Sequence, residues 1–273
     1  MIGKIICSLL SRLLLRQPIL LSCLLILWLG LLIGAGVGQS SEARSTELLT
    51  NATGFALPIA QVHPLPRPLA EWQDDARKGD YFEFVEPSPA GYLIWSRFPV
   101  QVYIEPANPD NASNASLWYT AVEEAVQAWS HYLPLTLTAT ANTADIEIWR
   151  ATPPLQPLKP TSEPNQPLIE RLPRVRAAET RYQFLIQRLE NTAVLEHRFT
   201  IYLSPNQTAT YTKATARHEL GHALGIWGHS PNPTDVLYFS QVQDSPAISD
   251  RDINTLKRIY QQPTHLGWAL SSP

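Results

Sequence analysis

The chain is poor in sulfur. Its two cysteines, Cys7 and Cys23, both lie within the first 38 residues, and its one methionine is Met1. Residues 39–273 therefore cannot form a disulfide among themselves, and they offer no thiolate as a nucleophile or metal ligand.

Positive charge is also scarce. The chain has 21 Lys and Arg against 24 Asp and Glu, and three of the basic residues, Lys4, Arg12 and Arg16, precede residue 39, where no acidic residue occurs. The remainder thus carries 18 basic and 24 acidic residues, a net charge of −6. We therefore expect no nucleic-acid partner. A hydrophobic content of 44% is ample for a core and excludes a disordered chain.

Residues 18–37 contain no charged side chain and are rich in Leu and Ile. About 20 such residues can cross the hydrocarbon core of a membrane as a helix. The small residues Ala35, Gly36 and Gly38 would suit signal cleavage, whereas the length of the apolar run favours an uncleaved anchor. We expect residues 1–38 to be a signal anchor or a signal peptide. The basic end then lies in the cytoplasm, and everything after Gln39 is extracytoplasmic, anchored or secreted.

Composition divides the rest of the chain. Residues 39–92 are predicted to be a linker and an N-terminal segment, whose aromatic residues after position 63 should lie across the following domain; an inhibitory propeptide is the alternative. Residues 93–262 form the domain itself, interrupted by seven prolines in residues 153–173. This insertion is either a spacer loop or a polyproline segment that docks a partner. Residues 263–273 are a C-terminal tail.

Hydrophobic periodicity predicts both strands and helices in residues 93–262. Ile146 and Ile148 alternate with Asp145 and Glu147, as in a strand buried on one face. Ser116 and Ser249 are candidate helix N-caps. This mixture predicts an α+β or α/β domain. The expected strands are 98–104, 135–141, 144–149, 180–187 and 197–203, and the expected helices are 117–132 (with Leu117 on its apolar side), 212–224 and 249–260.

The most informative stretch is residues 216–230, Ala-Arg-His-Glu-Leu-Gly-His-Ala-Leu-Gly-Ile-Trp-Gly-His-Ser. His218 and His222 are four residues apart, so on a helix both imidazoles lie on one face and can bind one zinc ion, with Glu219 beside them to activate water. Gly225 allows a turn after which His229 can become a third ligand. Three protein ligands leave an open coordination position, which is typical of a catalytic zinc site. A helix whose histidines merely pack is the alternative, but such residues suit an apolar core poorly.

With these residues in view, residues 93–262 resemble the matrixins, a family of the metzincin clan of zinc peptidases. The resemblance extends to Phe98-Pro-Val-Gln-Val-Tyr, to Ala144-Asp-Ile-Glu-Ile and to the final helical segment, residues 248–260. It implies an α+β, zincin-like catalytic domain: a twisted, mostly parallel sheet with an active-site helix and a C-terminal helix. It also implies that His218, His222 and His229 bind Zn²⁺ and that Glu219 is the general base.

The chain departs from the family pattern in two places. His229 comes one residue later than the family's third histidine, and we expect Gly228 to absorb the extra residue with a positive φ. Leu237 stands where the family has a methionine in a turn below the zinc; it conserves apolar volume and should keep that support. Phe239 occupies the position of a tyrosine ligand found in some metzincins. The four remaining histidines are expected at the surface: His63, His131, His197 and His265.

The sequence therefore predicts an extracytoplasmic zinc endopeptidase that hydrolyses extended peptide or protein substrates. The substrate should pair with a sheet edge within residues 180–187, and a selectivity pocket should lie near Tyr238 and Phe239. Two alternatives remain: a catalytically silent metzincin fold that serves as a surface binding module, and a hydrolase of non-peptide amides. The intact Glu219 argues against the first. Residues 18–37 are the expected membrane contact.

Overall fold

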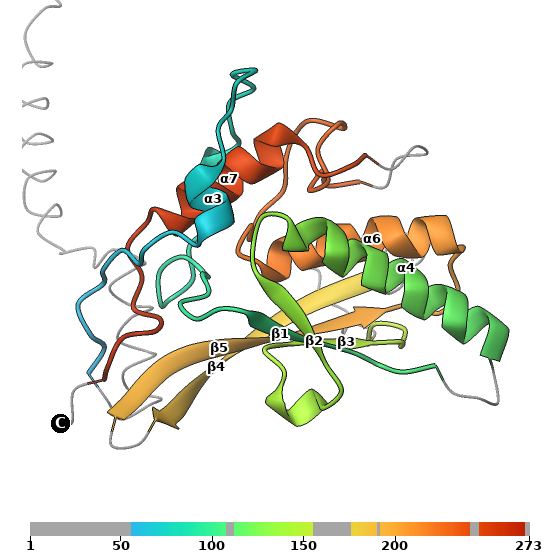
Figure 1. Ribbon diagram of the computed structural model, residues 1–273, viewed down its shortest axis with the longest axis horizontal. Coiled ribbons are helices and arrows are strands. Elements are labelled where there is room, and N and C mark those ends of the chain that lie inside the picture. The colour runs from blue at the N-terminus through green and yellow to red at the C-terminus, as the bar shows by residue number, and fades with distance from the viewer. Residues whose placement is uncertain (1–55, 108–111, 155–175, 190–191, 241–245, 271–273) are drawn as a thin grey trace, which may run out of the picture. The chain divides into compact units, whose positions relative to one another are not determined.

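A five-stranded sheet forms the centre of the structure, a computed structural model (Figure 1). Its spatial order is β2-β1-β3-β5-β4, in which β1, β2, β3 and β5 are parallel and β4 at the edge is antiparallel to β5. The predicted α+β, mostly parallel architecture is confirmed. The strands are β1 (Val100–Ile104), β2 (Leu135–Thr138), β3 (Ile146–Trp149), β4 (Ala178–Leu189) and β5 (Thr192–Leu203).

The structure describes residues 56–107, 112–154, 176–189, 192–240 and 246–270. The predicted leader 1–38 and most of the Pro-rich insertion lie outside these ranges. Within them, no helix combines the length and hydrophobicity needed to cross a membrane.

Helices α4 (Ala112–Ser130) and α6 (Ala209–Ala223) lie side by side over one face of the sheet (Figure 1). Between them and the sheet lies most of the core, in which Ile146 and Ile148 of β3 are completely buried, as their alternation predicted. The other elements are α3 (Arg67–Glu71), α7 (Asp250–Tyr260) and the short 3-10 helices η1 (Phe82–Phe84) and η3 (Ala141–Thr143).

Helix α4 differs from its prediction. It begins at Ala112, so Ser116 lies inside the helix and cannot be its N-cap. Leu117 is 59% exposed instead of facing the core. At this end of the helix Trp118 and Val122 face the core, in helical spacing with Ala125 and Trp129, and Leu117 is thereby rotated toward solvent.

Helix α7 agrees with its prediction. The Ser249 hydroxyl accepts a hydrogen bond from the backbone N–H of Asp252, and the Asp252 side chain accepts one from the backbone N–H of Ser249, which completes a capping box. Its apolar side, Ile253, Leu256, Ile259 and Tyr260, is buried.

The chain before β1 packs on this domain. Leu69 of α3 and Tyr81 are 0% and 1% exposed, and both belong to the main hydrophobic core. The Trp72 indole N–H donates to Asn254 of α7, and Gln61 and Thr264 exchange backbone hydrogen bonds. Described residues before position 93 thus contribute to the same core as the sheet.

Candidate metal centre

Helix α6 carries the first two histidines. The Thr208 side chain caps its N-terminus by accepting from the N–H of Tyr211, and the helix ends one residue after His222. Gly225 then adopts φ +124°, and a Cβ at this position would lie 2.5 Å from the Leu93 carbonyl oxygen. Glycine is required here both for the backbone conformation and for the close approach. The chain consequently turns back toward the helix.

The turn brings His229 to the other two histidines. One possible ligand atom from each of His218, His222 and His229 lies within 4.8 Å of the others. The ring of His229 is centred 5.3 Å from that of His218 and 4.8 Å from that of His222. The additional residue in the turn has therefore not removed His229 from the cluster.

Gly228 has a different role from the one predicted. Its φ is not among the positive values, so the expectation of a left-handed conformation is wrong. A Cβ at Gly228 would instead lie 2.0 Å from the Phe84 carbonyl oxygen, because the chain at η1 pairs with this turn through the Val85–Gly228 bridge. The Glu86 N–H also donates to the Trp227 carbonyl. The extra residue is accommodated by packing against the N-terminal segment.

The protonation of the histidines suits a metal ion. Nδ1 of His218 lies 2.8 Å from the Val236 carbonyl oxygen, and Nδ1 of His222 lies 2.8 Å from that of Ile226. A carbonyl only accepts, so each Nδ1 carries the proton and each neutral ring presents a lone pair at Nε2. These two Nε2 atoms are 3.1 Å apart. Two lone pairs at this separation are favourable only if a cation binds both, which fits zinc.

Electrostatics favours the neutral form of His222 and His229. Burial, followed by the neighbouring His218 and His229, lowers the pKa of His222 well below its usual value. Desolvation and the neighbouring His218 lower the pKa of His229 to about 4. Neutral imidazole is the form that binds metal, so these two rings are in the required state at neutral pH.

Glu219 follows His218 on α6, and burial raises the pKa of its carboxyl group. The Thr180 hydroxyl of β4 donates to Glu219 Oε2 at 2.6 Å. Thr180 is not among the site residues that the sequence predicts. It lies on a predicted edge strand, but periodicity alone does not indicate which helix residue a strand side chain meets.

Leu237 lies directly under the metal helix. It is completely buried, and a Cβ on Gly221 of α6 would be 2.5 Å from Leu237 Cδ2. The Ser230 N–H donates to the Leu237 carbonyl, which ties this turn to the residue after His229. The expected apolar support is therefore present, with leucine in contact with the helix.

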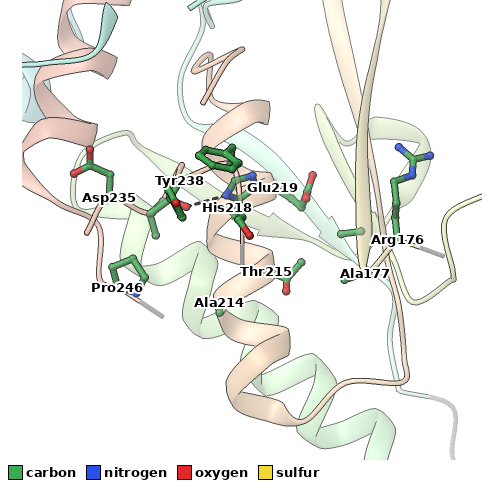
Figure 2. A pocket seen from close by; sticks show the side chains of 13 residues that line it. Arg176, Ala177, Ala214, Thr215, His218, Glu219, Asp235, Tyr238 and Pro246 are labelled. Atoms are coloured by element: carbon green, nitrogen blue, oxygen red, sulfur yellow. Dashed lines mark hydrogen bonds between the residues drawn. The ribbon is translucent and has the colours of Figure 1, made fainter. Parts of the chain in front are cut away.

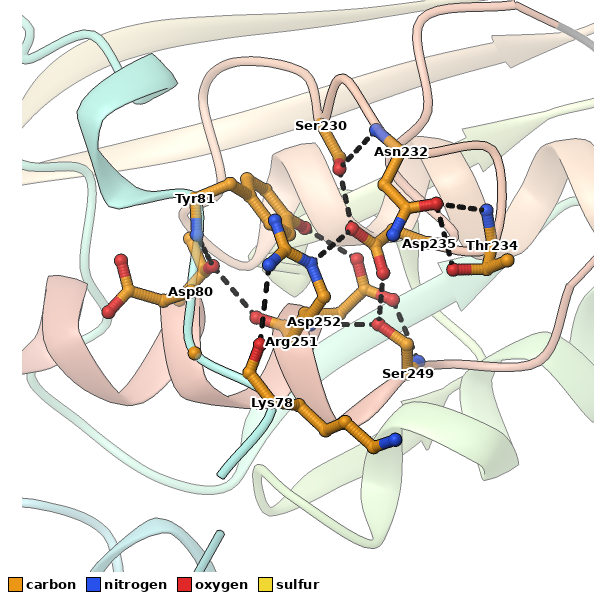
Figure 3. Close-up of polar contacts among 12 residues, drawn as sticks. Lys78, Asp80, Tyr81, Ser230, Asn232, Thr234, Asp235, Ser249, Arg251 and Asp252 are labelled. Atoms are coloured by element: carbon orange, nitrogen blue, oxygen red, sulfur yellow. Dashed lines mark hydrogen bonds and ion pairs between the residues drawn. The ribbon is translucent and has the colours of Figure 1, made fainter. Parts of the chain in front are cut away.

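A buried polar network at the N-terminus of α7 supports the site (Figure 3). Asp252 of α7 accepts hydrogen bonds from the Tyr81 hydroxyl at 2.5 Å and from the Val236 N–H at 2.9 Å. The Val236 carbonyl in turn accepts from His218. One chain of hydrogen bonds thus connects the N-terminal segment, α7 and a histidine of the centre.

Asp235 belongs to the same network and is 0% exposed. It accepts from the hydroxyls of Ser230 and Ser249 at 2.5 and 2.7 Å and pairs with Arg251 at 3.0 Å. A buried carboxylate is tolerated when it is paired in this way. The loop between His229 and Leu237 is thereby held to α7.

A pocket of about 260 Å³ opens beside His218 and Glu219 (Figure 2). Tyr238 and Phe239 line it, at the place where the sequence predicted a selectivity pocket. Phe239 is 65% exposed, so its ring lies at the rim. Other lining residues include Arg176, Ala177, Ala178, Ala214, Thr215 and Pro246.

The four scattered histidines do not extend the cluster; among the described residues, His218, His222 and His229 are the one group that could hold a metal. His131 is exposed, and His63 and His265 are partly buried. The prediction of a surface position is wrong for His197, which is 5% exposed and stacks on Trp95 at 4.1 Å. Its position on β5 faces the core, where its ring packs against Trp95 and Phe199.

Comparison with known protein families agrees with this geometry. The family model described as Matrixin matches residues 95–261, more than half of the chain and including every candidate site residue. No curated protein matches the chain.

Proposed function

Because this chain belongs to the matrixin family, we propose that it is a zinc-dependent endopeptidase in which His218, His222 and His229 hold the ion and Glu219 is the general base. The observation that carries the proposal is the convergence of three imidazoles beside the Glu219 carboxylate. When bound, zinc supplies Lewis-acid chemistry that activates water and polarises a carbonyl group.

Glu219 supplies the proton transfers. One carboxylate oxygen, Oε2, is held by Thr180, and Oε1 has no hydrogen bond among the described residues. Oε1 can accept a proton from the attacking water and deliver it to the amine that leaves. Burial raises the pKa of this carboxyl group, which makes it a stronger base than an exposed glutamate.

The substrate is proposed to be an extended peptide that binds along β4. This strand is at the edge of the sheet, and it reaches Glu219 through Thr180. An extended chain adds to such an edge through backbone hydrogen bonds, which give affinity with little dependence on sequence. Selectivity then falls to the pocket beside Tyr238 and Phe239.

The test is cleavage of an unfolded protein, such as reduced casein, by the purified full-length chain. Activity should disappear with a chelator and return with zinc. Glu219→Ala should bind zinc as the wild type does but lose proteolysis by at least about 100-fold, because the carboxylate is a base and not a ligand. Activity of Glu219→Ala within a few-fold of the wild type would refute this mechanism.

The same assay separates the alternatives. A binding module would hold zinc but cleave nothing in any form. A hydrolase of non-peptide amides would cleave small acyl amides and leave casein intact.

We also propose an extracytoplasmic location, supported by the basic residues before the apolar stretch 18–37. Protease added to intact spheroplasts should digest the domain; complete protection there, with the protein intact, would refute this orientation.

A further inference from the structure

The contact between Thr180 and Glu219 joins two elements that meet only in the folded domain. Thr180 is the third residue of β4, and Glu219 lies 39 positions later on α6. Besides the 2.6 Å contact to Oε2, the Thr180 hydroxyl oxygen lies 3.3 Å from the Glu219 carbonyl oxygen. A hydroxyl has one proton to donate. The carboxylate oxygen is the closer and the stronger of the two acceptors, so the proton is donated to Oε2.

Thr180 is fixed on a rigid part of the sheet. It is paired in register with Ile201 of β5, which is 1% exposed, so its side chain is on the face that α6 covers. Threonine is β-branched and has few accessible χ1 rotamers. The donor is therefore already oriented before any substrate arrives. Among the described residues, Thr180 is the one side chain that donates a hydrogen bond to the Glu219 carboxylate.

We propose that Thr180 is a positioning residue for the general base. The hydroxyl anchors Oε2, so that the carboxylate cannot rotate away, and Oε1 remains available for proton transfer. A base that moves between rotamers spends part of its time out of reach of the water that it must deprotonate. This role rests on the proposed peptidase function, because a binding module requires no oriented base.

Three variants test the role in the full-length protein, solubilised in a nonionic detergent. Thr180→Val keeps the shape but removes the donor, Thr180→Ser keeps the donor, and Thr200→Val makes the same change on the opposite face of the neighbouring strand. We expect Thr180→Val to lower kcat by about tenfold or more with KM changed less than about twofold. Thr180→Ser and Thr200→Val should stay within about threefold of the wild type. Zinc affinity, measured by chelator competition, should be unchanged in all three, because Thr180 contacts none of the histidines.

A second measurement does not depend on activity. The unfolding equilibrium constants of the wild type, Thr180→Val, Glu219→Ala and the double variant form a double-mutant cycle. We expect the double variant to depart from the product of the single effects by about tenfold, as for a hydrogen bond to a charged group.

The outcomes are distinct. Absence of coupling, an unimpaired Thr180→Val in an active protein, or a Thr180→Ser as impaired as Thr180→Val each overturns the proposal and leaves the peptidase function standing. A wild-type protein that binds zinc but cleaves no peptide overturns the proposed function, and with it the positioning role, even if the coupling is present.

Discussion

At the scale of single residues, His229 is where the chain departs most from the family pattern. The structure places it beside His218 and His222 although it comes one residue late. The aromatic ring of Trp227, within the lengthened turn, packs edge-on against Tyr182 of β4 with centroids 5.0 Å apart. The extra residue therefore lies in a packed turn, and the packing of this turn positions His229 beside the other two histidines.

We predict that His229→Ala weakens zinc binding by at least about 100-fold, because it removes one of three ligands. His131→Ala, at an exposed histidine directly after α4, should leave zinc affinity unchanged. Titration against a competing chelator measures both. Wild-type affinity in His229→Ala would show that another group completes the site.

Gly228 and Gly79 separate two reasons for glycine. Gly79 has φ +72°, but its nearest neighbour to an added Cβ is 4.0 Å away, whereas Gly228 lacks a positive φ but would place a Cβ 2.0 Å from the Phe84 carbonyl oxygen. We expect Gly79→Ala to cost about 1 kcal/mol of unfolding free energy and to keep zinc affinity. Gly228→Ala should cost about 1–3 kcal/mol and weaken zinc binding, because the turn that carries His229 must shift. Urea unfolding and chelator competition test the pair; equal zinc affinity in the two variants would contradict this account.

At the scale of elements, the N-terminus of α7 is a structural support for the metal centre. Asp252 serves both its own helix, as half of a capping box, and the Val236 peptide group that orients His218. Tyr81 adds the N-terminal segment to the same carboxylate. A single buried aspartate thus links three separate pieces of chain to the site.

We predict that Asp252→Asn lowers zinc affinity by about 10- to 100-fold, as expected for loss of a group that orients a ligand. The two carboxylate oxygens of Asp252 accept hydrogen bonds from Tyr81, Val236 and Ser249. The amide of asparagine has only one acceptor oxygen, so the Val236 peptide group should lose its fixed position. Asp250→Asn, in the same turn of α7, is the matched control and should affect zinc affinity little. Chelator competition at pH 7 decides; equal effects of the two changes would mean that helix charge and not the hydrogen-bond chain is responsible.

At the scale of the whole molecule, stability should depend on pH through His197. Burial lowers the pKa of this side chain to about 3, against about 6.5 in an unfolded chain. Between these values the unfolded state takes up a proton that the folded state refuses. The stability that depends on neutral His197 is therefore fully present above pH 6.5. As the pH falls below 6.5, the free energy of unfolding decreases by about 1.4 kcal/mol per pH unit, until the folded state also titrates near pH 3.

We predict that replacing His197 by Gln removes this part of the acid sensitivity. The Gln variant should be less stable at pH 7.5, because the stack on Trp95 is lost. The difference from the wild type should shrink as the pH is lowered from 6.5 to 5. Urea unfolding across this range measures it, and a difference that stays constant with pH would show that His197 is not buried in the neutral form.

The sequence by itself determined the chemistry that depends on local spacing. A helical period places His218 and His222 on one face, a strand period buries Ile146 and Ile148, and a serine followed three residues later by an aspartate caps α7. Each of these follows from the repeat of one element, so the residues needed are close together in the chain.

Only the tertiary structure decided how the site is completed. Thr180 reaches Glu219 across 39 positions, Tyr81 reaches Asp252 across 171, and Gly228 is constrained by a carbonyl group of η1. For the same reason, His197 is buried although it was expected at the surface, and Leu117 is exposed although it was expected in the core. Contacts between distant segments depend on which side chains win space in a shared core, and periodicity within one segment contains no information about its neighbours.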